Sequence, residues 1–325
     1  MGIVSSGLIV AVDGGGSKTD VVALDRTGAV LGRARVGGSS PHIEGLAESV
    51  RRIVGGIREA VSGRPVDTVH VYLSGLDLPV EITEFREAFG SAAPDLVGDL
   101  VVANDLFAVL RAGTREPDAV ALICGSGSNC IGLRGDGMQV TYASLGMISG
   151  DWGGGFGLSE WALWSAARGE DGRGEPTALQ EALAAHFGVS SVAEVTEGIH
   201  RGTLDRGRLL DVVPKLFALA DAGDTVARRI VEWQATEIVT QAAATIARMD
   251  RLGSEIPVVV GGGVIAGGNA RLLELVEEGL AERAPGARLT VVSEPPLVGA
   301  ALLALEAAGA PDAALNAASD ALKRA

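Results

Sequence analysis

The feature that most constrains the fold of this chain is a pattern that occurs twice. In each copy an apolar strand runs into a glycine-rich loop, a second strand follows, and a glycine turn leads to a third strand. Short apolar runs bounded by glycine are typical of buried strands joined as hairpins. The predicted strands are 8–12, 20–24 and 30–36 in the first copy and 118–123, 129–133 and 139–143 in the second.

The two glycine loops align residue by residue. They read Gly14-Gly15-Gly16-Ser17 in the first copy and Gly125-Ser126-Gly127-Ser128 in the second. We interpret the pattern as an internal duplication, whereas the plainer alternative is two unrelated hairpins of similar composition. Duplicated strand-rich units that alternate with helices predict an α/β protein with two lobes.

The rest of the chain extends each copy. In the first half we expect helices at 44–62, 82–91 and up to 112, with strands at 66–73 and 100–103. In the second half we expect a helical region over 156–252, strands at 257–260 and 288–292, and helices at 297–308 and 312–324. We therefore expect a lobe of residues 1–117, which the C-terminal helix 311–325 could join. The second lobe would be 118–310, with a helical insertion and a cleft between the lobes.

Composition excludes several classes of protein. Among 325 residues, 27 Lys and Arg stand against 41 Asp and Glu, a net charge of −14. This balance disfavours nucleic-acid and membrane-surface partners, which attract proteins with a positive field. Two cysteines exclude a disulfide framework and a four-cysteine metal site. Because the N-terminus resembles no signal peptide and no apolar run reaches about 18 residues, we expect a cytoplasmic protein.

The first glycine loop, Asp13–Thr19, has the features of a phosphate site. Consecutive backbone N–H groups in a glycine turn form a concavity that binds anions. Ser17, Lys18 and Thr19 add donors, and Asp13 fits beside phosphate if a divalent cation lies between them. The loop matches neither the Walker A spacing nor the dinucleotide motif, because a strand follows it. The alternative is an ordinary hairpin turn.

Two further glycine clusters lie at strand ends. If the halves face each other, the loop Gly125–Asn129 can hold a polyphosphate from the opposite side. Cys124 and Cys130 flank this loop, and buried small strand residues are the simpler interpretation of both. Residues 261–263 follow a β-branched strand, and 266–269 precede a helix. This arrangement indicates a nucleotide pocket, or only close helix–strand packing.

Two aspartates are candidates for chemistry. Asp105 stands where a strand meets a helix, so it is either a helix N-cap or a general base toward a substrate hydroxyl. Asp151 lies in the glycine-rich segment 149–156 together with Trp152 and Phe156. A carboxylate beside aromatic rings is typical of sites that bind sugar hydroxyls. Here too the alternative is a cap, for the helix that follows.

Taken in order, these motifs resemble those of the sugar-kinase, heat-shock-70 and actin ATPase superfamily. Within it, the chain resembles the BadF/BadG/BcrA/BcrD group, whose sugar-phosphorylating members include N-acetylglucosamine kinases. The resemblance extends from Leu8 to about Leu305. The matching segments are 13–19 and 124–130 for the phosphate loops, 101–107 and 297–305 for the connecting segments, 149–155 for the sugar loop and 258–268 for the adenosine motif.

The resemblance implies two ribonuclease-H-like lobes, as in actin-like ATPases, that close on an amino sugar and on ATP with Mg²⁺. It implies that Asp105 is the base and that Asp13 holds Mg²⁺ through water. The remaining implied contacts are Gly15, Gly16, Ser17, Lys18, Thr19, Gly127 and Ser128 to phosphates, Gly262 and Gly263 to adenosine, and Ser74, Gly75, Asp105, Ser126 and Asp151 to the sugar.

Two departures from the family pattern fall on the sugar side. Pro41 stands where N-acetylglucosamine kinases have an Asn that touches the sugar, and proline has no side-chain amide. Ser144-Leu145 replaces a Gly-Trp pair, which removes an aromatic wall. The resemblance therefore supports ATP as a substrate better than it supports N-acetylglucosamine.

Two alternative functions belong to other classes. ATPase activators of 2-hydroxyacyl-CoA dehydratases and benzoyl-CoA reductases resemble this core, but their cysteines bridge an iron–sulfur cluster between subunits. A non-catalytic ATP- or sugar-binding regulator is the other alternative, and the acidic residue retained at Asp105 counts against it. From the helical second lobe we expect a homodimer.

Overall fold

The two halves of the chain build two sheets with the same strand order. The computed structural model describes residues 7–96 and 98–323, so residue 324 of the last expected helix lies outside the described part. The sheet orders are β3-β2-β1-β4-β5 and β10-β9-β6-β7-β8. The strands are β1 (Leu8–Gly14), β2 (Lys18–Leu24), β3 (Val30–Gly37), β4 (Val66–Leu73), β5 (Asp99–Asn104), β6 (Ala119–Cys124), β7 (Ser128–Leu133), β8 (Gln139–Val140), β9 (Ile256–Gly261) and β10 (Ala287–Val291).

Strand pairing confirms the internal duplication. β1 pairs antiparallel with β2 and parallel with β4, and β6 pairs antiparallel with β7 and parallel with β9. The order β3-β2-β1-β4-β5 thus recurs as β8-β7-β6-β9-β10. The expected third strand of the second copy is much shorter than predicted, since only Gln139–Val140 pairs with β7.

Each sheet is covered by helices on both faces. In the first lobe, α2 (Leu46–Val61) and α3 (Pro79–Ala92) cover the outer face, and the short α1 (Pro41–Glu44) precedes them. Helix α4 (Leu106–Gly113) packs between the two sheets. The run Leu8–Val12 is almost fully buried, as a central strand between two helical layers requires.

The last two helices return to the first lobe. α12 (Pro296–Ala307) packs against β1 and α4, and α13 (Asp312–Lys323) packs against α12. The expected boundary at residue 310 is therefore too late, because α12 lies on the first sheet. Its alanine- and leucine-rich sequence predicts burial but carries no signal of which sheet it covers.

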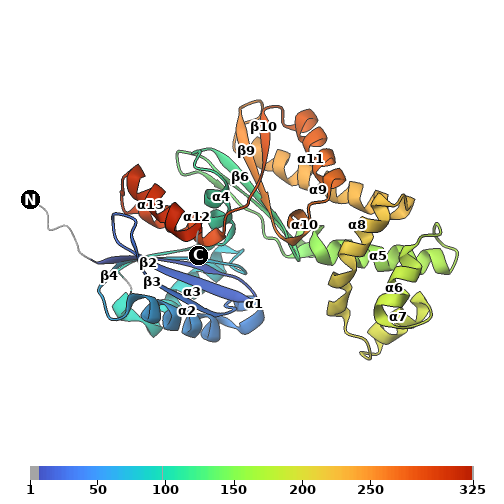
Figure 1. Cartoon of the computed structure of the whole chain (residues 1–325), viewed down its shortest axis with the longest axis horizontal. Coiled ribbons are helices and arrows are strands. Elements are labelled where there is room, and N and C mark those ends of the chain that lie inside the picture. The colour runs from blue at the N-terminus through green and yellow to red at the C-terminus, as the bar shows by residue number, and fades with distance from the viewer. Residues whose placement is uncertain (1–6, 97, 324–325) are drawn as a thin grey trace, which may run out of the picture.

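The second lobe holds the expected helical region between β8 and β9. It contains α5 (Gly154–Glu170), α6 (Leu179–Phe187), α7 (Val192–His200), α8 (Val213–Asp221) and α9 (Thr225–Arg248), and α10 (Gly263–Ala266) and α11 (Ala270–Arg283) follow β9. Helices α5 to α8 extend away from the second sheet, at the right of Figure 1. Within residues 7–96 and 98–323, no helix is long and apolar enough to cross a membrane.

Candidate functional site

The first glycine loop is held from both sides. Gly15 N–H donates to the carbonyl of Lys18 at 2.9 Å and closes the turn between β1 and β2. The carbonyl of Gly15 accepts from Ser39 N–H, and that of Gly14 accepts from Ser74 N–H. The backbone of Ser74, which we expected near the sugar, is thus hydrogen-bonded to the first glycine loop, which we expected near phosphate.

Thr19 does not face the expected phosphate position. Its side chain is fully buried, and its hydroxyl lies 3.0 Å from the carbonyl oxygen of Gly37 and 2.5 Å from Ser39 Oγ. The hydroxyl therefore braces the loop against its neighbour. The structure does not support the expected phosphate contact of Thr19, because its side chain is buried and its hydroxyl already bonds within the first lobe.

The exposed part of the loop is smaller than expected. Gly16 and Ser17 are exposed, and Gly15 is half-buried. The Lys18 side chain is 55% exposed, and its Nζ lies 2.9 Å from Asp20 Oδ2. The loop consequently presents backbone N–H groups, one hydroxyl and one partly neutralised cation to solvent.

The second glycine loop is bonded to the start of α5. Gly155 N–H donates to the carbonyl of Gly125, and Phe156 N–H donates to that of Ser126, both at 2.8 Å. These first helical N–H groups are therefore used within the protein. At Gly127 no atom of the described chain lies within 4 Å of where a Cβ would be, so this residue borders open space.

Asp105 occupies the N-cap position of α4, but its neighbour provides the side-chain cap. Among the described residues, the Asp105 side chain makes no capping hydrogen bond at the start of α4. Asn104 Oδ1 instead accepts from Leu106 N–H at 3.0 Å. The position expected for Asp105 is confirmed, whereas the side-chain cap expected there comes from Asn104. Burial chiefly, and then the charges of Asp13 and Asp77, raise the pKa of Asp105 to about 7.

Three carboxylates lie at the carboxyl ends of adjacent strands in the first sheet. Asp13 belongs to the end of β1, and Asp77 and Asp105 follow β4 and β5. Burial and the Asp20 charge raise the pKa of Asp13 to about 6, against a lowering by Lys18. Burial and the Glu81 charge raise that of Asp77 to about 6, and Asp151 adds to the rise.

Asp77 connects the two lobes and was missed by the sequence analysis. Its Oδ1 accepts from Asn104 Nδ2 at 2.9 Å and from Asn129 Nδ2, at the start of β7 in the second sheet, at 3.0 Å. A usable signal was its position directly after β4, which lies between β1 and β5. Side chains that follow neighbouring parallel strands meet at one sheet edge.

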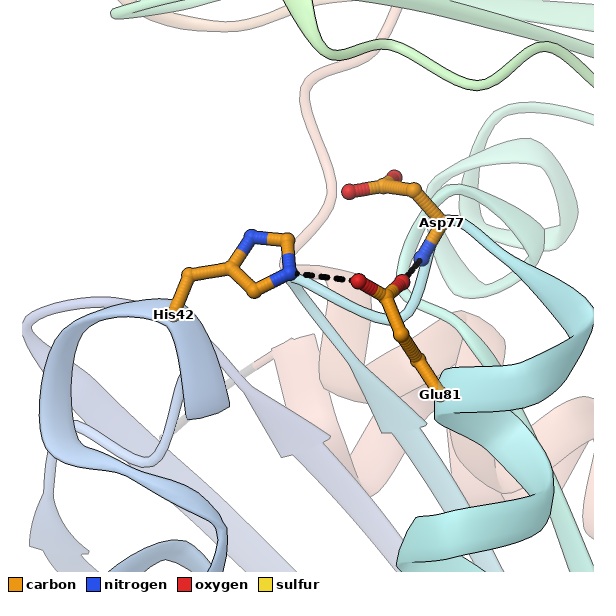
Figure 2. Close-up of side chains that lie close together, drawn as sticks. All are labelled: His42, Asp77 and Glu81. Carbon is orange, nitrogen blue, oxygen red and sulfur yellow. Dashed lines mark hydrogen bonds and ion pairs between the residues drawn. The ribbon is translucent and has the colours of Figure 1, made fainter.

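A small network positions Asp77 (Figure 2). Glu81 Oε2 accepts from the backbone N–H groups of Asp77 and Leu78, each at 2.8 Å, and Glu81 Oε1 lies 2.8 Å from His42 Nε2. Ligand atoms of His42, Asp77 and Glu81 lie within 4.8 Å of one another. Hydrogen bonds already use both oxygens of Glu81, so the network is complete without a metal ion. Pro41 begins the short helix that carries His42.

The segment before α5 carries the other expected sugar contacts. Asp151 is half-buried and accepts from Ser149 Oγ. The N-cap of α5 is Gly153, so the cap interpretation of Asp151 is wrong. Ser144 has φ of +51°, and its buried Oγ has no hydrogen-bond partner among the described residues. A left-handed serine at a position where the family has glycine indicates local backbone strain.

The expected adenosine motif borders a cavity of about 680 Å³. Gly263 lines this cavity together with Phe217 and Arg271, and a Cβ at Gly263 would meet no described atom within 4 Å. Gly262 has φ of +95°, and a Cβ there would lie 2.5 Å from the carbonyl of Cys124. Close packing between two strand ends therefore requires Gly262, whereas Gly263 borders the space where a ligand would lie.

Both cysteines lie in surroundings that make their thiols unreactive. Cys124 and Cys130 are buried, and burial raises the pKa of each thiol to about 12. A thiol with such a pKa is a poor nucleophile and a poor metal ligand near neutral pH. This agrees with the simpler interpretation of the two residues, as small buried strand residues.

Two duplicated lobes, with glycine loops at equivalent strand ends and carboxylates beside one of them, define an actin-like ATPase fold. The chain belongs to the BadF/BadG/BcrA/BcrD ATPase family, whose model matches residues 10–304. An N-acetyl-D-glucosamine kinase from Dictyostelium discoideum is 24% identical over 93% of this chain and 98% of its own length. An N-acetylmuramic acid/N-acetylglucosamine kinase from Clostridium acetobutylicum is 23% identical over 79% and 85%.

Solved structures share the fold. A candidate N-acetylglucosamine kinase from Chromobacterium violaceum is similar with a TM-score of 0.71 and 22% identity, over 92% of this chain and 99% of that one. A ROK-family glucokinase from Streptomyces griseus, solved with glucose and AMPPNP, gives a TM-score of 0.55 and 18% identity, over 98% and 100%. These similarities confirm the predicted two-lobed α/β architecture.

Proposed function

We propose that this chain is an ATP-dependent sugar kinase that phosphorylates a hydroxyl of an amino sugar such as N-acetylglucosamine or glucosamine. The observation that carries the proposal is the buried Asp105 carboxyl at the end of β5, whose side chain does not cap α4. Burial chiefly, and then the charges of Asp13 and Asp77, raise its pKa to about 7. Asn104 takes over the capping that would otherwise occupy this side chain. The names of the two curated relatives support the same reaction class.

In the proposed reaction Asp105 accepts the proton of the attacking sugar hydroxyl. The hydroxyl oxygen then forms its bond to the γ-phosphorus, while the bond to the bridging oxygen breaks and ADP leaves. A base with a pKa near the working pH is well matched to this transfer. Positioning of the phosphates provides much of the remaining rate in phosphoryl transfer.

The other proposed roles follow the two glycine loops. Ser74, Gly75, Ser126 and Asp151 would orient the sugar. The proposed phosphate contacts are Gly15, Gly16, Ser17 and Lys18 in the first lobe and Gly127 and Ser128 in the second, and Gly263 would border the adenosine, with Gly262 behind it.

The carboxylates also fit a divalent cation. Carboxylate oxygens are the donors that Mg²⁺ prefers. The charges of Asp13 and Asp77 add to the raised pKa of Asp105, so the three carboxylates lie close enough to interact. We assign Asp13 to hold Mg²⁺ through water, where the ion would neutralise charge on the phosphate oxygens. Asp77 is already bonded to two amides, so its role is to join the lobes.

The buried cysteines count against an activator that binds an iron–sulfur cluster between subunits. We propose a cytoplasmic enzyme and a homodimer, for which sedimentation gives the direct test. No membrane or nucleic-acid partner is part of the proposal.

The test is ADP release with Mg²⁺-ATP and a panel of glucose, glucosamine, N-acetylglucosamine, N-acetylmannosamine and N-acetylmuramic acid. We expect turnover on an amino sugar and a loss of about 10²–10⁴-fold in Asp105→Asn. Asp320→Asn, on the exposed face of α13, makes the same chemical change away from the cleft and should keep full activity. ADP release that does not depend on any sugar would contradict the proposal.

A further inference from the structure

All four tryptophans of the chain gather in one cluster. Trp152 precedes α5, Trp161 and Trp164 lie on α5, and Trp233 lies on α9. The ring centroid of Trp161 is 6.2 Å from that of Trp152, 4.8 Å from that of Trp164 and 4.7 Å from that of Trp233. The cluster is not closed to solvent, because Trp164 is 50% and Trp233 40% exposed.

A cavity of about 480 Å³ joins this cluster to Asp151, a proposed sugar contact. Gly127 and Ser128, the proposed phosphate contacts of the second lobe, line the same cavity, as do Trp161 and Trp164 of the cluster. Its volume lies within the roughly 300–1,000 Å³ typical of small-ligand pockets. The cavity is therefore continuous with the proposed acceptor site rather than a separate surface feature.

The cavity is longer than one sugar ring needs. Trp164 lies ten residues beyond Gly154, which corresponds to about 15 Å along the axis of α5. A ring that contacts Asp151 near the start of the helix does not extend over that distance. The Trp164 end consequently has room for a second group attached to the first.

The chemistry of the lining favours an uncharged sugar ring. Indole faces pack well against the C–H face of a pyranose, and a few polar groups fix its orientation. Ser144 lines the cavity, and its buried Oγ finds no hydrogen-bond partner in residues 7–96 and 98–323. Asp151 and Glu160 also line the cavity, and the chain carries −14 overall. These charges disfavour an acidic substituent.

We propose that this cavity binds a second, uncharged pyranose ring that is attached to the sugar to be phosphorylated. The acceptor would then be a disaccharide rather than a free monosaccharide. Trp164 is a specificity-determining residue in this arrangement, through contact with the second ring. The proposal rests on the proposed kinase function and names the substrate class of that same site.

The first test compares N-acetylglucosamine with its β-1,4-linked disaccharide, N,N′-diacetylchitobiose, as phosphate acceptors. We expect kcat/KM to be about tenfold higher for the disaccharide, which corresponds to about 1.4 kcal/mol. Trp164→Ala should lower the disaccharide-to-monosaccharide ratio about tenfold. Trp233→Ala is the matched control, because Trp233 belongs to the cluster but does not line this cavity, and it should keep the ratio within about twofold.

A ratio near one in the wild-type enzyme, or an equal ratio in Trp164→Ala and the wild type, would overturn the proposal. A second measurement separates this failure from failure of the kinase function. Because every tryptophan lies in the cluster, tryptophan emission of the whole protein reports on this region alone. Without ATP, we expect diacetylchitobiose to shift the emission of the wild type and to affect Trp164→Ala much less.

The outcomes are distinct. Emission that responds to the disaccharide in a protein that phosphorylates no sugar would support the cavity and refute the kinase. Turnover of N-acetylglucosamine with emission indifferent to the disaccharide would support the kinase and refute the cavity. A dimer whose emission changes with protein concentration and not with disaccharide would show that a second copy covers the cluster, which also overturns the proposal.

Discussion

The two lobes share one strand order but carry residues of different chemical character at the carboxyl ends of their strands. In the first sheet, the ends of β1, β4 and β5 carry or precede Asp13, Asp77 and Asp105. In the second sheet, Cys124 ends β6, and Gly262 and Gly263 follow β9. The duplicated scaffold thus places acidic groups at the strand ends of one lobe and open backbone at those of the other. In the proposed function, the first lobe provides the base and the cation ligand, and the second lobe borders the adenosine.

Among aligned positions of the two lobes, the largest expected effect comes from removing the Asp13 charge. Asp13→Asn keeps the shape of the side chain but loses its charge, so we expect kcat for sugar-dependent ADP release to fall about 100-fold. Cys124→Ala at the aligned position of the second lobe should leave kcat within about twofold. Equal losses in both variants would show that the two strand ends do not differ in role.

The next comparison lies within the second lobe, between two adjacent glycines. Gly262→Ala forces a side chain into a left-handed backbone and against Cys124, so we expect a loss of about 1–3 kcal/mol in stability. Gly263→Leu should keep the melting temperature but raise KM for ATP about tenfold, because its side chain enters the cavity. Thermal melts and ATP titrations check both values. The interpretation fails if Gly263→Leu changes only stability.

The charged Asp105 carboxylate that we propose as the base should also destabilise the folded protein. Its raised pKa means that the folded state holds a proton more tightly than the unfolded chain does. The resulting stabilisation is complete below the ordinary Asp pKa of about 3.9 and is lost as pH rises through about 7. At pH 8, without ligands, we expect Asp105→Asn to be about 1–3 kcal/mol more stable than the wild type. Urea unfolding at pH 8 and pH 4 measures the difference, which should shrink at the lower pH.

The smallest effect concerns the hydrogen bonds that Asp77 accepts from the two lobes. Asn129→Ala removes the bond from the second lobe and should cost about 1 kcal/mol. Asn104→Ala removes both the bond from the first lobe and the cap of α4, and should cost about 2 kcal/mol. Denaturant unfolding of the two single variants gives the comparison. If Asn129→Ala lost more free energy of unfolding than Asn104→Ala, the hydrogen bond from the second lobe would be the one that mainly holds Asp77.

Local patterns predicted most of the fold. The hairpins β1–β2 and β6–β7 follow from apolar runs interrupted by glycine, and the two strands of each hairpin are close in sequence. The sheet covered by α12 was not predictable in this way, because its partners β1 and α4 lie far from it along the chain. A helix buried on every side shows no polar face from which its neighbours can be inferred.

In the candidate site too, local sequence predicted some features, and contacts with other residues decided the rest. Asp105 was identified as a candidate by its position at a strand end, but its freedom from capping depends on the side chain of Asn104. Asp77 was missed because its amide partners lie 27 and 52 residues away in the sequence. The inward side chain of Thr19 was not predictable from its strand, because every residue of β2 after Lys18 is buried and no alternation separates its two faces.

The return of α12 and α13 to the first lobe has a consequence for synthesis of the chain. Ile9 and Ala11 of the first strand share a buried cluster with Val298 and Leu302 of α12, so the part of the first sheet under α12 stays uncovered until this helix leaves the ribosome. The strands of the second lobe all precede α12. We therefore expect the first lobe, although synthesised first, to finish folding last, and a chain that stops before residue 296 to expose apolar residues of β1.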